Sequence, residues 1–369
     1  MPSSRPLPRG VAVVLLVALL AAPLVGGALW QAGRRAAPAD ARTGVGFSPG
    51  FELLSEPVPA LRRDLRAMRE LGARRIRVDV SWAQVEPVEG QRDWTTVDRV
   101  VREARAAGLE VLGLLVYEPS WARRFGDAGA PLPVDPDAFA GFAAEAASRY
   151  RDDVTAWEVW NEPNTDRFWG AAPDPAAYAA VVRATSPALR AAAPEAEVVV
   201  GALAPARNLG NGATIRPETF VRDFYSALAP EERAPGVLFD ALSVHPYSFP
   251  VRPTAGVPWN TFARLESIRA TAEEAGGGDV EIWLTEYGAP TGASDRAVGE
   301  WRQALLVVEG LLAARRLDFT GPVYLYSYRD PRAAPQDFEA NFGLVTDAGR
   351  RKPAYWALRL VLAPWWSGL

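Results

Sequence analysis

Short apolar stretches rich in β-branched residues alternate with amphipathic stretches along most of the chain. The same order recurs: an apolar run, a loop, and a segment whose apolar residues recur at helical spacing. In the first such segment Leu61, Leu65, Met68 and Leu71 share one face. The predicted strands are 44–48, 75–80, 109–117, 154–160, 196–203, 239–247, 280–288 and 322–328, and the predicted helices include 58–72, 97–108, 175–193, 300–316 and 352–366.

Eight strands alternating with helices are the number expected of a TIM (β/α)8 barrel. A doubly wound open sheet is the competing fold. It would carry a glycine-rich phosphate turn after its first strand, and "GVGFSPG" at 44–50 lacks that spacing. The sequence therefore predicts one α/β barrel domain over 44–369. Active sites of this fold lie at the carboxyl ends of the strands, with 202–218 and 330–343 as candidate rim loops.

The first 43 residues are predicted to lie outside this barrel. Arg5 and Arg9 precede an uncharged apolar run over 11–30, which is the pattern of an export signal. Twenty apolar residues also suffice to span a bilayer. Residues 1–30 are therefore predicted to be a signal peptide or a membrane anchor, and 31–43 a linker. Either alternative predicts a barrel outside the cytoplasm, secreted or associated with the membrane through 11–30.

The composition excludes several classes of function. A net charge of −4 gives no support for nucleic-acid binding. The chain has no cysteine and a single histidine, His245, so thiolate and histidine-cluster metal sites are excluded, and we expect no metal or other cofactor. The loop 126–139 lacks the ligand spacing of a calcium site and is interpreted as a solvated turn. The 13 tryptophans suit flat apolar ligands such as sugar rings, as well as core packing.

Two glutamates stand at the ends of predicted strands rather than on helix faces. Glu162 ends the fourth strand in "WEVWNEPN", and Glu286 ends the seventh in "WLTEYG". One of them alone could be part of a buried ion pair. Two carboxyl groups across a barrel mouth are what cleavage of a glycosidic bond requires, one as proton donor and one ionised. Arg77, which alternates with Asp79 on one face of the second strand, is placed to keep one carboxyl ionised.

Together these stretches resemble a known group of enzymes. "RVDVSW", "WEVWNEPN", "SVHPY" and "WLTEYG" are similar to motifs of the clan A glycoside hydrolases, with families 39 and 5 as the nearest types. The resemblance covers roughly residues 43–360. It implies a carbohydrate substrate and an O-glycosyl hydrolase that retains anomeric configuration by double displacement.

The resemblance also implies roles for individual residues. Glu162 would be the acid/base and Glu286 the nucleophile, which Arg77 would hold ionised. Asn161 would bind the sugar 2-hydroxyl. His245 and Tyr247 would orient the carboxyl groups and the sugar, and Trp82 and Trp121 would line sugar subsites, with core packing as the alternative for both tryptophans.

One departure concerns the eighth strand, where many clan members carry a tryptophan beneath the sugar. Here "VYLYSY" offers Tyr324, Tyr326 and Tyr328, which alternation places on one face, and we select Tyr326. Two other functions remain as alternatives: a non-catalytic carbohydrate-binding or envelope protein on the same barrel, and a transglycosylase. The intact pair Glu162 and Glu286 argues against the first. Sugar, linkage and endo or exo action depend on the rim loops.

Overall fold

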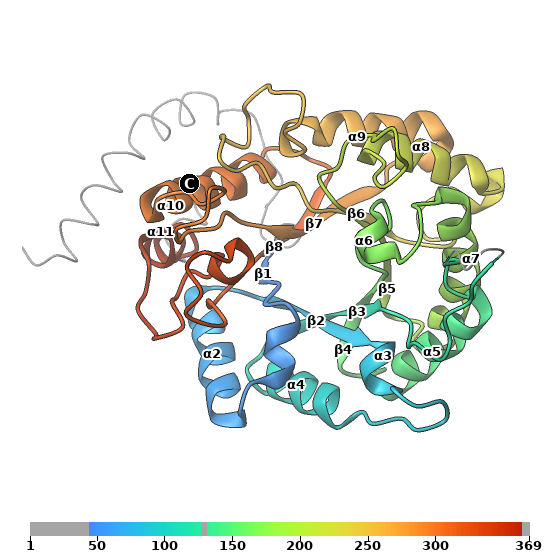
Figure 1. The fold of residues 1–369 in the computed structure, drawn as a ribbon, viewed down its shortest axis with the longest axis horizontal. Helices are drawn as coiled ribbons and strands as arrows, with labels where there is room; N and C mark the ends of the chain where they lie inside the picture. Colours follow the sequence, from blue (N-terminus) through green and yellow to red (C-terminus); the bar gives the residue numbers. More distant parts are fainter. Residues whose placement is uncertain (1–43, 127–130, 364–369) are drawn as a thin grey trace, which may run out of the picture.

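The computed structural model describes residues 44–126 and 131–363. Eight parallel strands form a closed barrel in sequence order, and β1 pairs with β8 to close it. Figure 1 shows the strands near the centre of the molecule with the helices around them. The strands are β1 (Val45–Phe47), β2 (Arg75–Ser81), β3 (Glu110–Val116), β4 (Val154–Val159), β5 (Glu197–Leu203), β6 (Ala241–Val244), β7 (Glu281–Tyr287) and β8 (Thr320–Leu325).

Helices connect successive strands, as the predicted (β/α)8 barrel requires, so the predicted fold class is confirmed. The longer helices are α2 (Val58–Leu71), α4 (Thr95–Ala106), α5 (Pro136–Arg149), α7 (Pro175–Ala192), α8 (Pro217–Ala227), α9 (Leu265–Ala272), α10 (Glu300–Ala314) and α11 (Pro353–Val361). Short helical segments lie in the loops: η1 (Phe51–Ser55), α3 (Trp82–Val85), α6 (Asp166–Trp169), η3 (Pro230–Glu232), η4 (Phe262–Arg264), η5 (Glu273–Gly277) and η6 (Phe338–Asn341).

No helix within the two described ranges is long and apolar enough to cross a membrane. The apolar run over 11–30 and the linker over 31–43 lie outside those ranges. Their predicted roles therefore stay predictions.

Helix α2 illustrates how the sequence pattern becomes local structure. Leu61, Leu65 and Met68 recur at helical spacing and are all buried against the barrel. The helix ends at Gly72, whose φ of 112° is open to glycine but strained for other residues. Its N–H donates to the carbonyl oxygen of Arg69, which satisfies a backbone group at the helix end.

The part of loop 126–139 that is described departs from the predicted solvated turn. Asp135 accepts hydrogen bonds from the backbone N–H groups of Asp137 and Ala138, and it is the N-cap of α5. Its carboxylate therefore starts a helix rather than sitting in a turn. The alanine-rich helix α5 packs mainly against α7, and it is the helix that the barrel requires between β3 and β4.

Close packing between β3 and β4 depends on a glycine at position 113. A Cβ atom added to Gly113 on β3 would lie 2.5 Å from the indole ring of Trp157 on β4. Trp157 is fully buried, so the ring has no free space into which to move. Gly141, by contrast, lies on α5 with no heavy atom within 4 Å of an added Cβ.

We expect Gly113→Ala to lower the free energy of unfolding by about 1–3 kcal/mol, because the methyl group overpacks the Trp157 site. The matched control, Gly141→Ala, should raise it by about 0.5–1 kcal/mol, since alanine is the better residue inside a helix. Urea unfolding followed by circular dichroism measures both changes. Equal effects of the two substitutions would contradict the packing assignment.

Candidate active site

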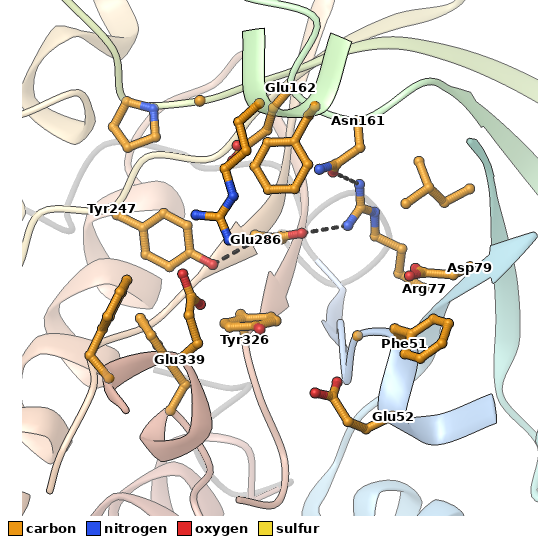
Figure 2. Close-up of a pocket in the computed structure, with 18 of the residues that line it drawn as sticks. Phe51, Glu52, Arg77, Asp79, Asn161, Glu162, Tyr247, Glu286, Tyr326 and Glu339 are labelled. Carbon is orange, nitrogen blue, oxygen red and sulfur yellow. Dashed lines mark hydrogen bonds and ion pairs between the residues drawn. The ribbon is translucent and has the colours of Figure 1, made fainter. Parts of the chain in front are cut away.

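A cavity of about 430 Å³ opens at the carboxyl ends of the strands. Strand ends and the loops that follow them form its wall, which is where this fold carries its active sites. Figure 2 shows Arg77, Asn161, Tyr247 and Glu286 converging there. The wall consists of Gly50, Phe51, Glu52, Arg77, Asp79, Leu114, Tyr117, Asn161, Glu162, Arg167, Phe168, Ala204, Pro205, Tyr247, Phe249, Glu286, Arg296, Tyr326, Phe338, Glu339 and Phe342.

Glu162 reaches the cavity through a strained turn just beyond β4. Its φ is 47°, and that of Trp160 two residues earlier is 68°, both in the left-handed region. Each such residue costs about 1–3 kcal/mol and persists only where the surroundings hold it. The Glu162 N–H donates to the Ala202 carbonyl oxygen at 3.1 Å, and the Glu162 carbonyl oxygen accepts from the Thr165 N–H at 3.0 Å. These bonds hold the backbone of the turn at Glu162 in place.

Glu286 enters the same cavity from the end of β7. Its Oε1 accepts a hydrogen bond from Arg77 at 2.6 Å, and its Oε2 accepts one from the Tyr247 hydroxyl at 2.8 Å. One oxygen of Glu286, one oxygen of Glu162 and one nitrogen of His245 lie within 4.8 Å of one another. The two glutamates selected from the sequence therefore form a pair across the barrel mouth.

Arg77 is the buried centre of the hydrogen-bonding network. Its Nε donates to Glu158 at 2.6 Å and its Nη2 donates to Asn161 at 2.9 Å, in addition to the bond to Glu286. Its Nη1 also lies 3.4 Å from the Ser48 hydroxyl. The guanidinium of this β2 residue thus joins side chains from β4, from β7 and from the loops after β1 and β4, and its planar fork suits several carboxylate partners.

Glu158 was not among the residues selected from the sequence. It is fully buried on β4, and one of its oxygens has no hydrogen-bond partner among the described residues. A glutamate inside an otherwise apolar strand, four residues before Glu162, is the signal that could have identified it. Its ion pair with Arg77 compensates part of the guanidinium charge.

The electrostatic surroundings favour the ionised form of Glu286. Burial alone would raise its pKa, but the charge of His245 when protonated, the charge of Arg77 and the hydrogen bond from Tyr247 together hold that pKa below its ordinary value. Asp79 behaves in the opposite way. Burial raises the pKa of Asp79 to about 6; Arg77 opposes this rise and the charge of Glu286 adds to it. One carboxyl group at the site is therefore kept ionised while a neighbour titrates in mildly acidic solution.

His245 stands between the two glutamates, at the end of β6. Its Nδ1 lies 2.9 Å from Oε1 of Glu162 and 3.7 Å from Oε2 of Glu286, and its ring is fully buried. Its Nε2 has no hydrogen-bond partner among the described residues. His245 and Tyr247 thus contact the two carboxyl groups, as the resemblance implied.

Glu162, His245 and Glu286 offer donor atoms close enough together to bind a metal ion. They are the one such cluster found in the described residues. Glu286 is, however, already paired with the Arg77 guanidinium at 2.6 Å. A divalent cation would face that fixed positive charge. The geometry fits two carboxyl groups held by hydrogen bonds from neighbouring side chains better than a metal centre.

The two tryptophans selected from the sequence do not lie on the cavity wall. Trp82 is 2% exposed, stacks on Phe142 in the core, and donates its indole N–H to Glu86. Trp121 lies edge-on to Trp82 and donates to the Glu86 carbonyl oxygen. Trp82 therefore packs in the core, which corrects its assignment to a sugar subsite. Trp121 is 36% exposed and lies outside the wall of this cavity, so its assignment stays a prediction. The helix α3 begins at Trp82 and turns its side chain away from the strand direction.

The choice among the three tyrosines of the last strand is decided by where β8 ends. Tyr326 lines the cavity, with its ring centroid 5.0 Å from that of Phe342. Tyr324 is buried inside the barrel, whereas Tyr328 packs against Phe47. Because β8 ends at Leu325, strand alternation applies at neither Tyr326 nor Tyr328, and the three side chains do not share one face.

Much of the remaining wall comes from the loops that follow the strands. Phe51 and Glu52 belong to η1 after β1, and Phe338 and Glu339 to η6 after β8. Phe338 and Glu339 lie in the rim loop predicted over 330–343. Ala204 and Pro205 come from the other predicted rim loop, over 202–218.

The rim loop after β8 is held by the chain's single lysine. Lys352 is 2% exposed, and its Nζ contacts Asp330 at 2.7 Å and the Thr291 hydroxyl at 2.9 Å. It also donates to the carbonyl oxygen of Asn341 at 3.3 Å. This buried cluster anchors the segment that brings Phe338 and Phe342 to the cavity.

Sequence comparison gives a local match. Residues 55–114 match a family model described as beta-galactosidase of glycoside hydrolase family 42. No curated protein matches the chain. The matched segment runs from η1 to β3 and includes Arg77 and Asp79.

Structural comparison extends over most of the barrel. A family 39 glycoside hydrolase from the gut symbiont Bacteroides cellulosilyticus WH2 has a TM-score of 0.68 and 22% identity, with 88% of this chain and 64% of that one covered. A GH39 beta-xylosidase from Caulobacter crescentus has a TM-score of 0.66 and 22% identity, with 90% and 73% covered. The exo-beta-1,4-mannosidase Op5Man5 from Opitutaceae bacterium strain TAV5 has a TM-score of 0.62 and 20% identity, with 87% of this chain and 59% of that one covered.

The chain resembles the clan A glycoside hydrolases. That prediction is confirmed for the fold by these structures and for residues 55–114 by the family model. The chain spans slightly less than two thirds of the first of these structures. Its own reaction and substrate therefore have to be argued from its site.

We expect Tyr247→Phe to raise the pKa of Glu286, because the substitution removes one hydrogen bond to the ionised carboxylate. A ¹³C NMR titration of the glutamate carboxyl groups measures the shift, with Glu286→Gln used to assign the signal. Tyr287→Phe is the matched control, since its hydroxyl donates to the Leu306 carbonyl oxygen. If both variants leave the Glu286 titration unchanged, the hydrogen bond from Tyr247 does not contribute.

Proposed function

We propose that this protein is a retaining O-glycosidase that cleaves an oligosaccharide or polysaccharide by double displacement. The observation that carries the proposal is the pair Glu162 and Glu286, whose nearest oxygens lie within 4.8 Å. Retaining enzymes hold their two carboxyl groups about 5–5.5 Å apart, whereas inverting enzymes separate them by about 6.5–9.5 Å to admit a water molecule.

In the first step of this reaction Glu286 attacks the anomeric carbon while Glu162 gives its proton to the leaving oxygen. Arg77 and Tyr247 favour the ionised Glu286 that this attack needs. The products are a glycosyl ester on Glu286 and a free leaving group. In the second step Glu162 takes a proton from water, which attacks the same carbon and releases Glu286.

Asn161 and His245 support this assignment through their contacts. Asn161 accepts from Arg77 through its Oδ1, and its amide N–H groups have no partner among the described residues, so they can donate to a sugar hydroxyl. His245 contacts both carboxyl groups. A barrel that only bound carbohydrate would not need a buried arginine shared between Glu286 and Glu158, which argues for catalysis.

We further infer export of the enzyme, from Arg5, Arg9 and the apolar run over 11–30. Fractionation of the producing cells, with N-terminal sequencing of the recovered protein, separates a cleaved signal from a retained anchor. Recovery in the cytoplasm with an intact N-terminus would contradict both.

The proposed reaction predicts how far each substitution lowers the rate of hydrolysis. On a panel of aryl glycosides, Glu286→Gln should abolish hydrolysis. Glu162→Ala should lower the rate by about 10²–10⁴-fold on poor leaving groups and far less on acidic ones, which need little proton donation. NMR of the first-formed product should show the anomeric configuration of the substrate.

Glu195→Gln, which changes an exposed glutamate outside the cavity, is the control for these substitutions. It should leave turnover unchanged. Inverted product would overturn the double displacement, and undiminished turnover by Glu286→Gln would overturn the nucleophile assignment. A purified, folded protein that hydrolyses no glycoside of the panel would favour the binding-protein alternative.

A further inference from the structure

Two arginines on the cavity wall have no acidic partner. Arg167 lies on α6, and Arg296 lies in the loop between β7 and α10. Neither makes a hydrogen bond or an ion pair within 4.0 Å to any described residue. Many other arginines of the described chain, such as Arg149 and Arg183, pair with a carboxylate. The wall thus presents two guanidinium groups with free N–H donors.

Aromatic rings hold these guanidinium groups in place. The Arg296 guanidinium carbon lies 3.9 Å from the ring centroid of Phe338 and 5.7 Å from that of Phe249. The Arg167 guanidinium carbon lies 5.1 Å from the ring centroid of Phe168. All three rings line the cavity. Stacking restrains each side chain and leaves the edge of its guanidinium group free, which reduces the ordering cost of binding an anion.

The acidic residues of the cavity are unevenly distributed around these arginines. Figure 2 shows Phe51, Glu52 and Asp79 on one side of Glu286, and Tyr247 and Glu339 on the other. Glu339 is the carboxylate that both Arg167 and Arg296 influence electrostatically, although neither pairs with it within 4.0 Å. Arg167 and Arg296 thus contribute two positive charges around Glu339, whose carboxyl group is also acted on by the negative charges of Glu286 and Glu162.

The position of Arg167 relates this rim to the substrate. Arg167 follows Glu162 by five residues on the same connection between β4 and α7. In the proposed reaction the proton of Glu162 goes to the leaving oxygen, so groups beside Glu162 face the leaving-group side of the bond. An anionic substituent there would contact the arginine rim without approaching Glu286.

We propose that Arg167 and Arg296 together bind an anionic substituent, a carboxylate or a sulfate ester, on the leaving-group side of the glycan substrate. The inference rests on the proposed glycosidase function and names the substrate class for it. Planar guanidinium groups bind both kinds of anion through paired charge-assisted hydrogen bonds. Glu339 limits the affinity, because its carboxylate competes for the same two cations.

The test uses the full chain and three substrates that share one sugar, namely a sugar hydrolysed in the panel above. Their umbelliferyl leaving groups carry a methyl group, a carboxylate or a sulfate ester. The quantity compared is the ratio of kcat/KM between variant and wild type, which cancels the intrinsic reactivity of each leaving group. Arg167→Ala and Arg296→Ala should each lower kcat/KM roughly three- to tenfold more on an anionic substrate than on the methyl substrate.

Glu339→Gln should act in the opposite direction and raise kcat/KM on the anionic substrates, since it removes the competing charge. Added salt at about 0.5 M should weaken the anionic preference of the wild type, because screening acts on exposed charges. Arg222→Ala is the matched control, because this exposed arginine lies on α8, outside the cavity. Its loss should leave kcat/KM on all three substrates unchanged.

The outcomes separate this proposal from the proposed function. If the arginine variants hydrolyse all three substrates and lose the same factor in kcat/KM on each, the anionic subsite is overturned and the proposed glycosidase function stands. Absence of hydrolysis on every sugar overturns the glycosidase. A loss confined to the carboxylate substrate, or to the sulfate ester, supports the subsite and identifies the anion that it takes.

Discussion

The site depends on one buried guanidinium group. Arg77 is 2% exposed and satisfies its donors with Glu158, Glu286 and Asn161. Removing one partner from a buried ion pair costs about 3–5 kcal/mol, since the other charge is left uncompensated. The fold therefore holds strands β2, β4 and β7 in register at the cavity floor. The same contacts keep Glu286 ionised, so stability and chemistry share one set of bonds.

The backbone at the strand ends provides a second constraint. Tyr117, Trp160, Glu162 and Ala202 all have φ between 45° and 68°, and all lie at or just beyond the ends of β3, β4 and β5. Such conformations are unfavourable for residues other than glycine and persist where packing holds them. In this barrel they lie next to the cavity, where the chain must leave the strand direction abruptly. The strain aims Glu162 toward Glu286.

The outer part of the cavity follows a different principle. Its floor is made of strand ends, but its rim is made of loop residues such as Phe338, Arg167 and Arg296, held by ring stacking and by the buried Lys352. Loops can change while the barrel and the acid pair remain, which is how one fold serves many substrates. The uneven charge of this rim is consistent with selection of the leaving group rather than with the bond-breaking step.

The sequence by itself determined the barrel and the chemical pair. Strand and helix periods are local properties, so eight alternating units and the positions of Glu162 and Glu286 could be found by pattern. Tertiary structure decided the rest. Glu158 pairs with Arg77 across 81 positions, η6 brings Phe338 to the cavity wall, and Trp82 turns into the core. Contacts between distant segments depend on how strands curve and where loops fold back, and no local period encodes them.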